Sequence, residues 1–361
     1  MFYICILIKN NNNIKIITFI LSIVICFFVS KFIKWKNFDF LKKKQNIASK
    51  RFSLQSKPIF GGVNFFIIFI LLIVLEFFTN GFEIEKESIC LLLVGIVAFA
   101  MGLADDILNT SPYFKFLMQI FCTLIFIFSG TFIEFSSYNW CNYLITGFWV
   151  VGIMNSFNML DNMDGVSGFT ALSIFGGIIF YSLFFDTVLL NFEITILIGL
   201  SAALLFFLFY NWYRSEMYMG DNGSQFIGAT LAYFGIRFFT NNVEINYTNN
   251  SFNFIQIIIL ISAFIIPITD TTSVTINRLM KKKSPFCGDK NHTTHHLFYL
   301  GIPIKIIGPI LFFLNLIGVI SAFILLNNSQ NISYQQTLLF LIYPFIVFVL
   351  LYLNTKITKE K

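Results

Sequence analysis

The sequence predicts an all-α polytopic membrane protein with about 11 transmembrane helices in a single integral membrane domain, residues 1–361. Its composition is 57% hydrophobic and only 12% charged, against about 25% charged in an average soluble domain. A soluble globule could not cover its surface with so few polar side chains. Apolar runs of roughly 20 residues recur along the chain, and that length crosses a bilayer as a helix. Helices are expected because backbone groups in lipid must satisfy one another.

The expected spans follow the apolar runs in chain order. They cover residues 16–33, 63–80, 88–104, 114–133, 143–160, 166–185, 194–213, 225–240, 254–276, 302–326 and 336–354. No small-residue cleavage site follows the first run, so we expect it to be an anchor and not a signal peptide.

The distribution of positive charge predicts the orientation of these spans. With the N-terminus outside and the C-terminus cytoplasmic, 24 lysines and arginines divide very unevenly between the two sides of the membrane. All of them fall on the inside except Lys9, Lys15, Lys86 and Arg237. An excess of lysine and arginine in cytoplasmic loops is the established signature of orientation. We therefore predict a multi-pass membrane protein with the N-terminus outside and the C-terminus in the cytoplasm.

The same topology brings four polar clusters to the cytoplasmic side. They are Asp105 with Asp106, the run 155–165, the run 220–224, and the histidine segment 292–296. The outside connections carry no comparable cluster, so we expect one active site at the inner membrane boundary.

Asp105 and Asp106 close the third expected span. Negative charge is disfavoured at a helix C-terminus by the helix dipole. A divalent cation or a basic partner would offset that repulsion. The alternative for an isolated Asp-Asp pair is a solvated helix end.

The run 155–165 is more specific. Asn155, Asn158 and Asp161 recur every three residues, so a helix would place them on roughly one face. Asp164 and Gly165 then form the turn into the next span. Polar side chains inside an apolar stretch are costly unless they face protein, water or ligand, which favours a functional role over simple capping.

Gly220 and Asp221 open the eighth expected span in the run 220–224. A glycine-rich helix N-terminus can present backbone N–H groups to phosphate, and a carboxylate can hold Mg²⁺. Taken alone the motif is weak, because a Gly-Asp turn with a Ser cap is also a common helix start.

All three histidines of the chain, His292, His295 and His296, lie in one basic loop. Imidazole titrates near neutrality and binds phosphate or metal, so the loop is a candidate for chemistry at the membrane surface. Asp270 in the preceding span is interpreted as a structural partner of Arg278 more readily than as a catalytic group.

Five segments in order carry a family resemblance: 58–62, Asp105 with Asp106, 155–165, 220–224, and 284–297. Together they resemble the polyprenyl-phosphate N-acetylhexosamine-1-phosphate transferases, glycosyltransferase family 4. This membrane superfamily includes the bacterial translocase that makes lipid I and the enzymes that load GlcNAc-1-phosphate onto undecaprenyl phosphate. The matching core extends from about residue 58 to 301.

The resemblance implies a reaction, a cofactor and partners. A polyprenyl phosphate would attack the sugar-linked phosphorus of a UDP-N-acetyl amino sugar, releasing UMP, with Mg²⁺ (alternatively Mn²⁺) as cofactor. The expected partners are these two substrates and the membrane, without nucleic acid; a homodimer stays open.

The resemblance also implies residue roles. Asp105 would act as base or orienter for the lipid phosphate, with Asp106 beside it, and Asp221 would be the leading metal ligand. The remaining candidates would hold nucleotide, metal, diphosphate or sugar: Asn155, Asn158, Asp161 (also a metal ligand), Asp164, Gly220, Lys290, His292, His295 and His296.

The loop pattern resembles the GlcNAc-1-phosphate branch more than the lipid I translocases. It departs from that branch at Thr293 and Thr294, where a bulky apolar residue is often found. The first alternative keeps the chemistry with UDP-MurNAc-pentapeptide or another UDP-N-acetyl amino sugar. The second is a cation-coupled transporter, which would place ionisable residues near the bilayer midplane on broken helices.

Overall fold

The computed structural model of the chain describes residues 2–36, 59–80, 86–185, 187–212, 215–241, 243, 254–284, 291–329 and 331–358. Within these ranges the regular secondary structure is helical, and β pairing is limited to an isolated parallel bridge between Ile59 and Tyr218. The predicted all-α class is confirmed. Lys290 and most of the basic loop before the histidines lie outside the described residues.

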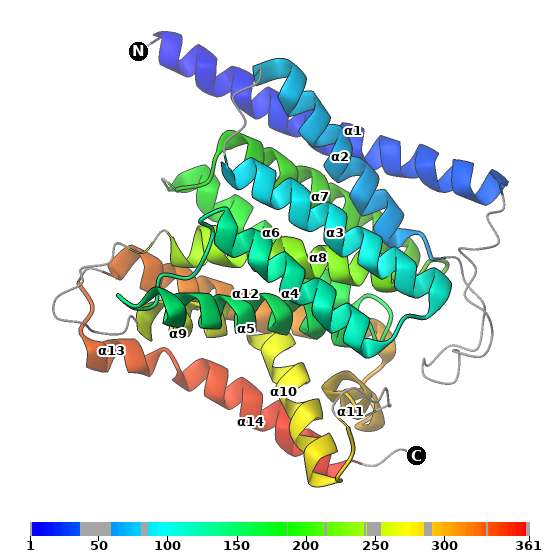
Figure 1. Cartoon of the computed structure of the whole chain (residues 1–361), viewed down its shortest axis with the longest axis vertical. Helices are drawn as coiled ribbons and strands as arrows, with labels where there is room; N and C mark the ends of the chain where they lie inside the picture. The colour runs from blue at the N-terminus through cyan, green and yellow to red at the C-terminus, as the bar shows by residue number, and fades with distance from the viewer. Residues whose placement is uncertain are drawn as a thin grey trace.

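The helices follow the apolar runs, and each of the expected spans overlaps a helix (Figure 1). They are α1 (Phe2–Lys36), α2 (Gly61–Asn80), α3 (Lys86–Leu108), α4 (Pro112–Phe128), α5 (Asn139–Leu160), α6 (Val166–Phe184), α7 (Asn191–Asn211), α8 (Gly220–Phe234), η3 (Gly235–Thr240), α9 (Phe254–Ala263), α10 (Ile265–Met280), α11 (Thr293–Tyr299), α12 (Ile304–Asn328), α13 (Tyr334–Leu339) and α14 (Ile342–Ile357).

The predicted number of spans is not confirmed. The described residues contain eight helices long and apolar enough to cross a membrane, or up to nine if the bent pair α9 and α10 is one span. Three expected spans account for the difference. α4 has 17 residues, α8 has 15 and continues into the 6-residue π-helix η3, and the axes of α9 and α10 differ by 88°.

The short helix α8 is the most enclosed element of the bundle. Every residue of α8 is buried except Asp221. Figure 1 shows α8 crossing the middle of the bundle, where it packs against α2, α3 and α5. A helix that is surrounded by protein need not be long enough to span lipid, which explains why α8 is short and why its N-terminus can carry polar residues.

Two glycines allow the N-terminal turn of α8 to approach its neighbours. A Cβ atom on Gly102 of α3 would lie 2.3 Å from the carbonyl oxygen of Asp221 and 2.5 Å from the Cα of Asn222. A Cβ on Gly62 of α2 would lie 2.3 Å from the backbone nitrogen of Gly223. Both helices therefore touch the backbone of α8 itself, at the turn that carries the polar run 220–224.

The chain leaves the bundle at the break between α9 and α10. Figure 1 shows α10 extending away from the bundle toward the end of α14, with α11 beside it. A small hydrophobic cluster separate from the main core joins these elements to α12, and it includes Ile265, Ile266, Leu297, Ile307 and Leu351. The histidine segment thus packs with α10, and the direction of α10 relative to α9 is determined at the break.

We expect Gly102→Ala to destabilise the protein by about 1–3 kcal/mol, the usual cost of overpacking a close contact. Backbone atoms of α8 are what the added methyl group would meet, so they cannot move aside as a side chain can. Thermal unfolding in detergent measures the effect. Gly152→Ala in α5 is the matched control, since a Cβ there meets nothing within 4 Å. Equal melting temperatures for the two variants would contradict the close approach.

Candidate active site

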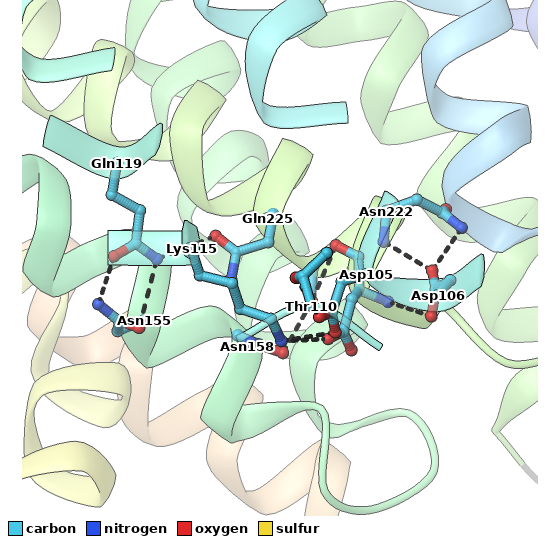
Figure 2. A network of polar contacts seen from close by, with 11 residues as sticks. Asp105, Asp106, Thr110, Lys115, Gln119, Asn155, Asn158, Asn222 and Gln225 are labelled. Carbon is cyan, nitrogen blue, oxygen red and sulfur yellow. Dashed lines mark hydrogen bonds and ion pairs between the residues drawn. The ribbon is translucent and has the colours of Figure 1, made fainter. Parts of the chain in front are cut away.

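Asp106 joins the end of α3 to the beginning of α8. Its carboxylate accepts hydrogen bonds from the backbone N–H of Asp221 (3.2 Å), the backbone N–H of Asn222 (2.9 Å) and the side-chain amide of Asn222 (2.8 Å), as Figure 2 shows. Met219, at the N-cap position of α8, makes no side-chain cap hydrogen bond. A carboxylate from a neighbouring helix therefore caps α8, where the unpaired N–H groups and the helix dipole favour negative charge.

This capping changes the interpretation of the Gly-rich turn. The N–H groups of Asp221 and Asn222, which the sequence suggested for phosphate binding, are occupied by Asp106. Gly220 has a φ of +80°, and a Cβ there would lie 2.1 Å from Ile59 and 2.8 Å from the Asp106 carboxylate. Gly220 therefore permits this contact, and Asp106 caps α8. The catalytic role expected for Asp106 beside Asp105 stays a prediction.

Lys115 is the residue that sequence reasoning missed. Its ammonium nitrogen lies 2.6 Å from Asp105 Oδ2 and 2.8 Å from Asp221 Oδ2, and Thr110 donates to the other oxygen of Asp105 at 2.6 Å. The lysine thus links α3, α4 and α8 (Figure 2). Its signal in the sequence is its isolation, because it is the only charged residue of α4, and charges within apolar helices tend to be functional.

A chain of amides extends the site along α5. The amide nitrogen of Asn155 donates to Gln119 of α4 at 2.8 Å, and Gln119 donates to Gln225 of α8 at 3.3 Å. One turn further along α5, Asn158 accepts a hydrogen bond from Ser224 of α8 at 3.3 Å. The expected polar face of α5 is present, and it meets α4 and α8.

The end of that run departs from the predicted helix. α5 ends at Leu160, and Asp161 is its C-cap, so Asp161 lies beyond the helical face of Asn155 and Asn158. Ser167 at the start of α6 donates to Asp161 at 3.1 Å. Asp164 and Gly165 form the expected turn, in which Gly165 adopts a φ of +80° and donates to the side chain of Asn211 at 2.6 Å.

The histidine segment is held by a buried carboxylate. Asp270 of α10 is fully buried and contacts His292 Nδ1 at 2.8 Å. Its other oxygen accepts from the backbone N–H of Thr293 at 2.9 Å and from the Thr293 hydroxyl at 2.6 Å. Both oxygens are therefore engaged by the N-terminus of α11. Asp270 therefore has a structural role, as expected. Its partners in these contacts are His292 and Thr293, whereas the sequence suggested Arg278.

Two further contacts connect this segment to the rest of the site. Thr294 donates to Asn162 in the turn after α5 at 2.7 Å. His296 Nδ1 lies 2.6 Å from the hydroxyl of Thr358, just beyond α14. The histidine segment 292–296 and the run 155–165 therefore meet through Thr294 and Asn162, as expected for clusters on one face.

Hydrogen-bond chemistry assigns the tautomers of two histidines. A carboxylate only accepts, so His292 carries its hydrogen on Nδ1 toward Asp270. Thr358 donates to the carbonyl of Asn354 at 2.8 Å, so its oxygen accepts from His296 Nδ1. In the neutral ring each Nε2 is then a proton acceptor, and protonation at Nε2 would turn it into a hydrogen-bond donor to a phosphate oxygen.

The donor set suits Mg²⁺ that is shared with a substrate. No group of three or more histidine, cysteine or acidic side chains that could hold a metal ion comes together within the described ranges. Asp105 and Asp221 nevertheless converge on one cation, the Lys115 ammonium. Mg²⁺ commonly uses one or two carboxylates and takes its other ligands from phosphates and water, so these two carboxylates fit it.

The sequence is similar to known proteins over most of its length. It matches glycosyl transferase family 4 over residues 88–239. It is 27% identical to a probable undecaprenyl-phosphate N-acetylglucosaminyl 1-phosphate transferase of Bacillus subtilis, over 81% of this chain and 78% of the relative. It is 30% identical to a phospho-N-acetylmuramoyl-pentapeptide-transferase of Campylobacter lari, over 60% of this chain and 71% of the relative. It is also 27% identical to a decaprenyl-phosphate N-acetylglucosaminephosphotransferase of Mycolicibacterium smegmatis, over 62% of this chain and 59% of the relative.

We expect Lys115→Met to destabilise the fold, because Asp105 and Asp221 then face each other without the ammonium. The loss should fall below the roughly 3–5 kcal/mol seen for a fully buried pair, since the lysine side chain is 22% exposed. Thermal unfolding measures it, with the exposed Lys281→Met as control. Adding Asp105→Asn to the Lys115 variant should recover part of the loss. A Lys115 variant as stable as wild type would contradict the ion-pair assignment.

Proposed function

We propose, since this chain belongs to glycosyl transferase family 4, that it transfers GlcNAc-1-phosphate from UDP-GlcNAc to undecaprenyl phosphate. Its relatives are polyprenyl-phosphate sugar-1-phosphate transferases, and the chain is an enzyme of this phosphotransferase class. The observation that carries the proposal is the cluster of Asp105, Lys115 and Asp221, where α3, α4 and α8 meet. The Bacillus relative, which matches most of both chains, supports GlcNAc as the sugar.

The reaction is a displacement at phosphorus. A phosphate oxygen of the lipid forms a new bond to the sugar-linked phosphorus, and the bond from that phosphorus to the UMP oxygen breaks. UMP leaves, and the polyprenyl-diphosphate sugar stays in the membrane. Catalysis of phosphoryl transfer is mainly positioning and charge neutralisation. A site that combines carboxylates with a lysine and imidazoles meets both needs.

The residues divide by their place in the cluster. Asp105 would orient the lipid phosphate, and Lys115, which already bridges two carboxylates, would neutralise phosphate charge. Asp221 is the first candidate to bind Mg²⁺ or Mn²⁺. Further candidates are Asp105, which contacts the same Lys115 ammonium group, and Asp161, which follows α5. The metal, when bound, would neutralise charge on the phosphate oxygens.

The remaining candidates surround this cluster. Asn155 and Asn158 line the side of α5 that faces α4 and α8 and would contact the nucleotide. His292, whose Nδ1 is held by Asp270, would present Nε2 to the diphosphate or the sugar, together with His295 and His296. Asp164 and Lys290 retain the roles that the family resemblance implies for them.

We place the site at the cytoplasmic face of a bacterial inner membrane, with the N-terminus outside and the C-terminus inside. Lysine and arginine excess on that side supports this orientation. The functional groups also lie at helix ends: Asp105 near the end of α3, Lys115 in the first turn of α4, and Asp221 in the first turn of α8. A transporter would need them near the bilayer midplane, so the transporter alternative is not favoured.

The second candidate function keeps the reaction and changes the sugar. The similarity to the Campylobacter phospho-N-acetylmuramoyl-pentapeptide-transferase supports UDP-MurNAc-pentapeptide as an alternative donor. Both donors present the same diphosphate to the cluster, so only direct comparison separates them.

We expect purified protein with Mg²⁺ and undecaprenyl phosphate to release UMP from UDP-GlcNAc and to form a lipid-linked sugar. A panel that includes UDP-GalNAc and UDP-MurNAc-pentapeptide tests the donor, with UMP release and lipid product both measured. Turnover with the muramoyl donor alone would favour the second candidate. Absence of turnover with every amino-sugar donor, from well-folded protein, would refute the transferase proposal.

We expect Asp221→Asn to lower kcat roughly 100- to 1,000-fold, the scale seen when one preorganised electrostatic contact to the reacting group is lost. The dependence of rate on Mg²⁺ concentration should shift to higher concentrations, because the leading carboxylate is gone. Chelation by EDTA should abolish turnover of the wild type. The exposed Glu134→Gln is a matched control for loss of one carboxylate charge. Unchanged activity and metal dependence in the Asp221 variant would refute the metal assignment.

A further inference from the structure

At the break between α9 and α10, the carbonyl of Ala263 and the backbone N–H of Ile266 have side-chain partners from another helix. Pro267 has no N–H, so the carbonyl of Ala263, four residues earlier, lacks the donor that a continuous helix would supply. Phe264 adopts a φ of −115° and a ψ of 31°, which interrupts the helix between Ala263 and Ile265. Unpaired backbone groups in a protein interior cost free energy, so an 88° break at this depth requires a partner.

Asn315 of α12 supplies that partner. It accepts from the backbone N–H of Ile266 at 3.2 Å and donates to the carbonyl of Ala263 at 3.1 Å. Its amide also donates to the hydroxyl of Ser173 on α6 at 2.9 Å. The side chain is completely buried. One amide therefore takes the place of the missing helical bonds on both sides of the break, and α6 holds that amide in place.

The packing of α12 keeps the amide in reach of the break. A Cβ on Gly318, three residues after Asn315, would lie 2.1 Å from the carbonyl oxygen of Ser262. α12 therefore contacts the backbone at the end of α9 directly. α12 therefore holds the break in two ways, through the close contact at Gly318 and through the hydrogen bonds of Asn315.

The direction of α10 decides where the histidine segment lies. Asp270, a few residues beyond the break, holds His292 and Thr293. The 16 residues of α10 make a helix about 24 Å long, so a tilt of about 10° at the break would move its far end by about 4 Å and Asp270 by about 1 Å. A displacement of that size at a reacting group can lower a rate roughly 100-fold.

We propose that Asn315 is a positioning residue for the transferase reaction, which it serves by fixing the α9–α10 break and thereby the place of Asp270 and His292. This inference rests on the proposed function for its effect on rate. Asn315 itself is placed at the bend and not at the substrate. This role requires a side chain that both donates and accepts hydrogen bonds, so an apolar residue of similar volume cannot replace Asn315.

The test compares Asn315→Leu, Pro267→Ala and the double variant with wild type. Spin labels at positions 113 and 280, both exposed, report the distance from the start of α4 to the end of α10 in a cysteine-free full-length background. Steady-state kinetics give kcat and KM for both substrates. Asn328→Leu is the matched control, because Asn328 ends the same helix and is exposed.

We expect Asn315→Leu to shift or broaden the label distance and to lower kcat roughly 10- to 100-fold, with KM for UDP-sugar little changed. Pro267→Ala restores an N–H that can pair with the Ala263 carbonyl in a straight helix. The double variant should therefore regain thermal stability but neither the wild-type distance nor the wild-type kcat. Asn328→Leu should match wild type in every measurement.

Three results would overturn the proposal. They are a wild-type distance and kcat in Asn315→Leu, a loss of kcat with an unchanged distance, and a double variant with wild-type kcat. If Asn315→Leu does not fold, Pro267→Ala alone must still alter the distance and lower kcat, because its new N–H competes with Asn315. The distance measurement needs no turnover, so a wild type inactive on every donor would refute the proposed function and leave the bend itself testable.

Discussion

The site depends on the contact between the Asp106 carboxylate and the first turn of α8. That contact supplies hydrogen-bond acceptors for the N–H groups at the start of a helix that begins inside the protein. It is possible only because Gly102 and Gly62 let α3 and α2 reach the α8 backbone. Once α8 is placed, Asp221 must lie beside Asp105, and the two carboxylates require a cation between them. Lys115 is that cation in the structure. The packing of α2 and α3 on α8, the capping of α8 and the charge balance of the candidate site therefore depend on one another.

The remainder of the site is built on a second, smaller framework. α10 leaves the bundle at a break that Asn315 holds, Asp270 then fixes the start of α11, and Thr358 after α14 contacts His296. Asn162 and Thr294 join this framework to the turn after α5. Asp105 and Asp221 thus come from helices packed inside the bundle, whereas the histidines come from a segment whose position depends on one bend. Such a division would suit the proposed reaction, in which a diphosphate is held between a membrane lipid and a nucleotide sugar.

Much of the site was predictable because its residue types are costly in apolar helices. Carboxylates, amides and histidines at the ends of apolar runs have few stabilising environments, so their presence alone indicated a site and its candidates. The prediction was less successful where roles depend on which neighbour a side chain meets. Asp105 and Asp106 are adjacent in sequence, yet one faces Lys115 and the other caps α8. Lys115 itself looked like one more cytoplasmic lysine.

The sequence by itself determined the helical membrane class, the positions of the apolar helices and the polar segments from which the site is assembled, because hydropathy and the cost of buried charge act locally along the chain. Only the tertiary structure decided that α8 is enclosed by other helices, that Asp106 caps it, that Asp270 holds His292, and that Asn315 bridges a broken helix. Each of those outcomes depends on contacts between residues distant in sequence. Backbone groups freed at a helix end or a break are satisfied by whatever side chain the packing brings near, and hydropathy carries no information about that partner.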